Sequence, residues 1–180
     1  KFIGMMKTFP LYTQHDAMDC GPTCLRMITA FYGKNYPQAY LREQCFITNE
    51  GVSMLGISEA AEKIGIHTIG VQTDMERLNN DVPLPCILHW NQNHFVVLYR
   101  IRKTKRDTFF YIADPAGSKI KYNKEEFMRC WISSKSGDNK TGVALCLEPT
   151  PEFYNNDIYD DEPTNRKNFS FLFSYLKPYK

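Results

Sequence analysis

The sequence predicts an α+β fold in which N-terminal helices pack on an antiparallel β-sheet. Up to about position 65, apolar side chains recur at helical spacing. Later segments are short, rich in β-branched and aromatic residues, and separated by turn residues. Helices that precede strands, rather than alternate with them, are typical of this class. The chain has 180 residues, of which 43% are hydrophobic and 23% charged, so it is long enough for one sizeable core.

Four helices are expected, over residues 22–32, 37–45, 54–64 and 124–130. Pro22 suits a first helical turn, and Gly33 and Gly65 supply the left-handed conformation that ends a helix. Ser53 and Asn123 are expected to cap the helices that follow them, because their side chains accept hydrogen bonds from free backbone N–H groups.

Six strands are expected in the second half of the chain, over residues 66–71, 86–90, 94–101, 109–114, 120–122 and 143–147. The basic run at 100–106 is interpreted as the tip of a hairpin. No internal repeat is visible.

A cysteine stands where the first helix begins. Cys20 is expected at a strand-to-helix junction, six positions after Gln14. The N-terminus of a helix offers free N–H groups and a partial positive charge, which favour a thiolate. Cys20 is therefore the candidate nucleophile.

The hairpin between residues 94 and 114 supplies two more candidates. If its strands pair symmetrically about a loop centred near Thr104, His94 and Asp114 are directly opposed. Opposed side chains lie on one face with Cβ atoms about 4.5 to 5.5 Å apart, close enough for a carboxylate to hold an imidazole. A slip of one residue would separate them.

These residues together predict an acyl-transfer site. Cys20 would attack a carbonyl, His94 would pair with it and protonate the leaving amine, and Asp114 would fix the imidazole tautomer. The Gln14 amide would join the Cys20 backbone N–H in an oxyanion hole, where one donor is typically worth about 3 kcal/mol.

Other chemistries are disfavoured. A net charge of +2 is too small to indicate nucleic acid. Cys20 and Cys24 lack a second Cys/His pair, so no metal site is expected, and the six cysteines are expected to be free thiols in a reducing compartment. The remaining histidines have no comparable partner and are expected to play no direct part; they are His15, His67 and His89.

Several blocks in order resemble the bacteriocin-processing peptidase domain of ABC exporters, over residues 8–148. The blocks are Gln14, Asp19-Cys20-Gly21-Pro22, Gly51-Val52-Ser53, Pro85 to Trp90, His94 to Leu98 and Ala113-Asp114-Pro115. The resemblance implies a papain-like fold that cleaves leader peptides after a double glycine, coupled to export, on the cytoplasmic face of the bacterial inner (cell) membrane. The family's catalytic cysteine, histidine, aspartate and oxyanion glutamine fall on Cys20, His94, Asp114 and Gln14.

The resemblance also implies the kind of substrate contacts. A narrow cleft would exclude residues with a Cβ beside the scissile bond, and Trp90 is the candidate wall. The rest of the leader would bind as an amphipathic helix on an apolar surface. Met54, Leu55 and Ile57 are the candidates for that surface.

The chain is expected to divide into a peptidase domain (1–148), an acidic, proline-bearing linker (149–168) and the start of a truncated membrane-entry helix (169–180), or else an ordinary docking helix. There is no Gly-x4-Gly-Lys-Ser/Thr loop. No cofactor is expected in this domain, and ATP, the ATPase and the transmembrane domains are expected beyond residue 180. The isolated domain is expected to be a monomer.

Two other functions stay open. One is a leader-peptide receptor that does not cleave, against which the presence of Cys20 argues. The other is deamidation or transglutamination by the same Cys-His-Asp site, because different nucleophiles can attack a thioester. A thiol redox protein is weaker, since Cys20 and Cys24 lack thioredoxin-like spacing.

Overall fold

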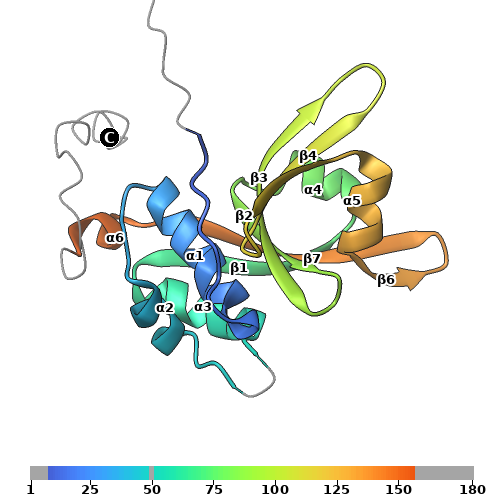
Figure 1. The fold of residues 1–180 in the computed structure, drawn as a ribbon. Helices are drawn as coiled ribbons and strands as arrows, with labels where there is room; N and C mark the ends of the chain where they lie inside the picture. The colour runs from blue at the N-terminus through green and yellow to red at the C-terminus, as the bar shows by residue number, and fades with distance from the viewer. Residues whose placement is uncertain (1–7, 49–50, 157–180) are drawn as a thin grey trace, which may run out of the picture.

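A computed structural model describes residues 8–48 and 51–156. Three helices gather on one side of a curved antiparallel sheet, and α5 covers its other face (Figure 1). The helices are η1 (Ala17–Asp19), α1 (Cys20–Phe31), α2 (Gln38–Gln44), α3 (Met54–Lys63), α4 (Met75–Asn80), α5 (Lys124–Trp131) and α6 (Pro151–Asn155). The predicted α+β class, with N-terminal helices on an antiparallel sheet, is confirmed.

The sheet has seven strands in the order β1-β7-β2-β3-β4-β5, with β6 paired to β7. The strands are β1 (Ile66–Thr73), β2 (Cys86–Trp90), β3 (His94–Lys103), β4 (Thr108–Asp114), β5 (Ser118–Tyr122), β6 (Ile132–Ser136) and β7 (Asn139–Pro149). The β3–β4 hairpin brings the candidate residues His94 and Asp114 to one end of the sheet.

The two faces of the sheet build two hydrophobic cores. Val97 packs with the residues of α1 to α3, whereas its neighbour Leu98 packs with Phe127 and Trp131 of α5. Adjacent strand residues point to opposite faces, so each strand serves both cores. One face of the sheet therefore packs against α1, the helix that begins with Cys20.

The predicted caps at Ser53 and Asn123 and the predicted stop at Gly33 are confirmed, whereas α1 begins at Cys20, two residues before the expected start at Pro22. The Ser53 side chain accepts from Gly56 N at 3.0 Å, and Asn123 forms a reciprocal capping box with Glu126. Gly33 has a φ of 95° and ends the α1 turn, where a side chain would be strained.

Some elements differ from expectation. Cys20 does not follow a strand; irregular chain and the short η1 precede it. The helices α4 and α6 and the strand β6 were not predicted. β6 lacks an apolar face, because its residues 133–136 are all exposed polar side chains, and it pairs only with the similarly polar start of β7.

The start of the expected linker belongs to the packed domain. Residues 149–156 finish β7 and form α6, whose Phe153 is fully buried. Thr150 donates from N and Oγ1 to the Gly65 carbonyl, and Lys34 Nζ donates to the Asn156 carbonyl. The expected membrane-entry segment, 169–180, lies outside the described residues. Within 8–48 and 51–156, no helix is long and apolar enough to cross a membrane.

Candidate active site

The β3–β4 hairpin does not have the expected register. Near its tip Lys103 pairs with Thr108, and the turn is closed by a hydrogen bond from Thr104 N to Asp107 O of 2.8 Å. The turn is therefore centred later than Thr104. The prediction that His94 and Asp114 are directly opposed was wrong, because Val97 already faces Ala113 and the two residues are offset along the strands.

A bulge nevertheless brings the two side chains to the same face. The register shifts by one residue between Leu98 and Arg100. Without that extra residue, the pairing of the tip would continue and place His94 and Asp114 on opposite faces, because side chains alternate. With it, they are diagonal neighbours, and His94 Nε2 lies 2.7 Å from Asp114 Oδ1.

The pair has shifted pKa values. Burial lowers the pKa of His94, but hydrogen bonds to Asp114 and Cys20, together with their negative charges, outweigh it and raise the pKa from 6.5 to about 9. For Asp114, burial raises the pKa, while the bonds from His94 and from Ala116 N bring it below its ordinary value. At neutral pH the site therefore favours an imidazolium held by a carboxylate.

Cys20 completes this group from the other side of the site. It is the first residue of α1, is 5% exposed and contacts the His94 imidazole through its thiol. α3 packs closely behind it: a Cβ at Gly21 would lie 2.8 Å from Ile57 Cδ1.

Gln14 is carried by the irregular segment that leads to η1. Its backbone N donates to the Pro115 carbonyl at 2.8 Å, which ties this segment to the residue after Asp114. The Gln14 amide oxygen is buried, and no hydrogen-bond partner for it occurs in the described part of the chain. The structure thus brings segments carrying all four sequence-predicted residues together.

The four residues expected to contact the substrate differ in how far they are exposed. Trp90 is 2% exposed and packs edge-on against Tyr122 and Phe127, so it is a core residue and not a cleft wall. Ile57 is fully buried. Of that set, Met54 is half-buried and Leu55 is 66% exposed.

The other histidines lie outside this constellation. His67 Nδ1 lies 3.1 Å from Glu62 Oε1 on the surface, His89 packs beside the Phe95 ring, and His15 is exposed. Over residues 8–48 and 51–156, no three His, Cys, Asp or Glu side chains gather closely enough to hold a metal ion. All six cysteines are free thiols.

A cysteine at the start of a central helix, facing a hydrogen-bonded histidine and aspartate on an antiparallel sheet, defines a papain-like cysteine peptidase domain. The chain belongs to the Peptidase C39 family, whose model matches residues 8–150.

Curated relatives include two processing transporters. The chain is 33% identical over 144 residues to the colicin V secretion/processing ATP-binding protein CvaB of Escherichia coli, covering 80% of this chain and 19% of that protein. It is 31% identical over 145 residues to the pediocin PA-1 transport/processing ATP-binding protein PedD of Pediococcus acidilactici, covering 78% and 18%. The chain thus spans about a fifth of the length of these relatives.

Solved structures show the same fold. A double glycine motif protease from an AMS/PCAT transporter, in complex with the leader peptide, matches with a TM-score of 0.69 and 35% identity, over 79% of this chain and 93% of that chain. The peptidase domain of Streptococcus ComA, a bifunctional ABC transporter of a quorum sensing pathway, matches with a TM-score of 0.63 and 31% identity, over 79% and 100%.

Proposed function

We propose that this domain removes a double-glycine leader from a peptide substrate, with Cys20 as nucleophile, His94 as acid and base, and Asp114 as the residue that orients His94. The observation that carries the proposal is the 2.7 Å contact between His94 and Asp114, with Cys20 against the same imidazole, in a chain of a peptidase family.

The first step forms a thioester. The Cys20 sulfur attacks the carbonyl carbon of the scissile peptide, and a C–S bond forms as the carbonyl electrons move to oxygen. The Cys20 N–H and the Gln14 amide would stabilise that oxyanion. His94 gives its proton to the leaving nitrogen, the C–N bond breaks, and the C-terminal part of the substrate departs as an amine.

The second step restores the enzyme. Neutral His94 takes a proton from water, whose oxygen attacks the thioester carbon. The C–S bond breaks, so the thiolate is released and the leader leaves as a carboxylic acid that loses its proton to solvent. His94 keeps the proton taken from water and is paired again with the Cys20 sulfur. Asp114 keeps its charge throughout and stabilises the imidazolium in both steps.

Double-glycine specificity is supported by the related structure of a double glycine motif protease in complex with the leader peptide. Leu55, which is exposed, is proposed to contribute to an apolar surface for the leader, with Met54 beside it. Because Trp90 and Ile57 are buried, these two residues are not assigned to that surface.

The domain is proposed to work as one part of a larger exporter. The curated relatives are about five times longer than the match and are named as secretion or transport proteins that bind ATP. ATP would bind in another domain of the same protein, and this domain would face the cytoplasm at the bacterial membrane. By itself it is proposed to be a monomer.

The test is cleavage of a synthetic leader-core peptide with Gly-Gly at the junction, read by mass spectrometry. A single cut after the second glycine is expected with the wild type. The Cys20→Ala variant should not cut. Cys130→Ala, at a partly exposed cysteine outside the site, should cut normally. Cleavage by the Cys20→Ala variant would refute the assignment of Cys20 as the nucleophile. A mass gain of about one dalton on glutamine-containing peptides, without any cleavage, would favour deamidation.

A further inference from the structure

A buried carboxylate lies directly before the proposed nucleophile. Asp19 is 2% exposed, and its Oδ1 lies 3.0 Å from Arg42 Nε of α2. That oxygen accepts no aligned hydrogen bond, so its contact with the guanidinium is mainly an attraction of charges. Burying a carboxylate is costly unless it is paired, and Arg42 is the charge that pairs it.

Helix capping does not explain this aspartate. Asp19 is the N-cap residue of α1, a position where an aspartate side chain usually accepts a backbone N–H. Here the side chain makes no capping hydrogen bond. It turns instead to Arg42 of α2, a helix that is also joined to the first turn of α1 by a 2.9 Å hydrogen bond from Gln38 Nε2 to Thr23 Oγ1.

We propose that the Arg42–Asp19 ion pair positions Cys20 and balances the negative charge that Asp19 carries at the position directly before Cys20. Asp19 and Cys20 are neighbours in the chain, so fixing the Asp19 side chain fixes the first turn of α1. A lone carboxylate there would oppose a thiolate, and Arg42 cancels it. Arg42 is a positioning residue and touches no reacting atom.

The other groups around the start of α1 do not replace Arg42. His94 and Asp114 face Cys20 from the sheet and already pair with each other. Cys24, one turn later, is fully buried. Its pKa is raised mainly by burial and further by the charge of Cys20. From α3, Ile57 presents an apolar side chain.

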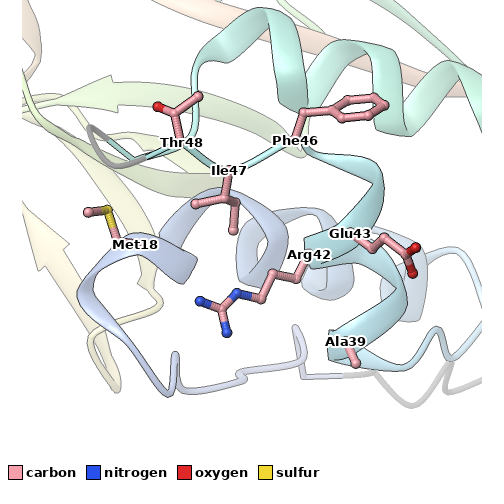
Figure 2. A pocket seen from close by; sticks show the side chains of 7 residues that line it. All are labelled: Met18, Ala39, Arg42, Glu43, Phe46, Ile47 and Thr48. Atoms are coloured by element: carbon pink, nitrogen blue, oxygen red, sulfur yellow. The ribbon is translucent and has the colours of Figure 1, made fainter.

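Substitution of Arg42 should leave the hydrophobic core intact, because the Arg42 side chain is 48% exposed. It lines an open basin of about 590 Å³ together with Met18, Ala39, Glu43, Phe46, Ile47 and Thr48. Figure 2 shows the Arg42 side chain extending from α2 within this basin. Glu43 lines the same basin and is the matched control, since it carries charge without contacting Asp19.

The first test measures thiol reactivity, which needs no substrate. The rate at which iodoacetamide alkylates Cys20 is followed at pH 7 by peptide mapping. Arg42→Gln should slow it about tenfold, because a like charge disfavours the thiolate. Arg42→Lys and Glu43→Gln should stay near the wild-type rate, and Asp19→Asn should be faster. The double variant Asp19→Asn/Arg42→Gln should return toward the wild type.

The second test uses leader-core peptide cleavage and rests on the proposed function. Arg42→Gln should lower kcat about 10- to 100-fold with KM nearly unchanged, because misplacing the nucleophile affects the transition state more than binding. A raised KM with an unchanged kcat would instead make Arg42 a substrate contact and overturn the proposal.

The outcomes separate this proposal from the function. If the wild type cuts no peptide, the alkylation rates still decide the role of the pair. If Arg42→Gln alkylates at the wild-type rate, or the double variant stays as slow as Arg42→Gln, charge balance is refuted. If Arg42→Gln does not fold by circular dichroism, Asp19→Asn decides: a rate equal to or below the wild type overturns the proposal.

Discussion

His94 Nε2 and Asp114 Oδ1 lie 2.7 Å apart although the two residues are not cross-strand partners. The bulge between Leu98 and Arg100 turns an odd register into an even one, so both side chains reach the same face of the sheet. One extra residue in β3, five positions from the histidine, therefore determines whether the pair forms.

Replacing Asp114 by asparagine should lower the pKa of His94 from about 9, because the carboxylate supplies both a hydrogen bond and a negative charge. The pKa is measured by NMR titration of the His94 ring. Asp107→Asn, in the turn of the same hairpin, is the control and should leave it unchanged. An unshifted His94 pKa in Asp114→Asn would contradict the contact.

Cleavage of the leader-core peptide should weaken at alkaline pH. Because the leaving amine needs a proton from His94, whose pKa is about 9, kcat/KM should fall as pH rises through about 9. Asp114→Asn should move this fall to lower pH, because the carboxylate helps to raise the His94 pKa. A kcat/KM that stays constant through pH 9 and above would refute His94 as the acid.

His94→Ala and Asp114→Asn should differ in severity. Removing the acid and base should lower kcat by about 10²- to 10⁴-fold, whereas loss of the orienting carboxylate should cost less. Single-turnover cleavage of the leader-core peptide measures both. Wild-type activity in Asp114→Asn would exclude it from the site.

Gly65→Ala should destabilise the domain more than Gly137→Ala. Both glycines have positive φ, 88° and 59°, so each substitution costs about 1 to 2 kcal/mol. A Cβ at Gly65 would also lie 2.5 Å from Phe153 N, whereas one at Gly137 meets no atom within 4 Å. Overpacking typically adds about 1 to 3 kcal/mol. Urea unfolding measures the difference, and equal losses would mean that α6 does not dock there.

The sequence predicted the residues of the candidate site better than it predicted their arrangement in the fold. The caps at Ser53 and Asn123 and the strand β2 follow from local preferences and were correctly predicted. The contact between His94 and Asp114 was also expected, but for the wrong register. Neither the bulge nor the late turn has a glycine or proline to mark it, so the pairing required the folded sheet.

Tertiary packing decided the remaining differences. Trp90 looked like a cleft wall, but α5 covers it, which no local pattern indicates. Residues 149–156 read as linker because they are polar and contain proline, yet Phe153 among them fills the space beside Gly65. The Asp19–Arg42 pair was missed because its partners are 23 positions apart on different helices.

The most direct measurement is the mass of the protein after acid quenching during turnover of a Gly-Gly leader-core peptide. We expect an adduct equal to the leader acyl group, mapped to Cys20 as a thioester, that disappears as cleaved leader accumulates. Cys20→Ala should show neither adduct nor product. Cleavage without an adduct on Cys20, or an adduct on another cysteine that persists in Cys20→Ala, would contradict the proposed mechanism.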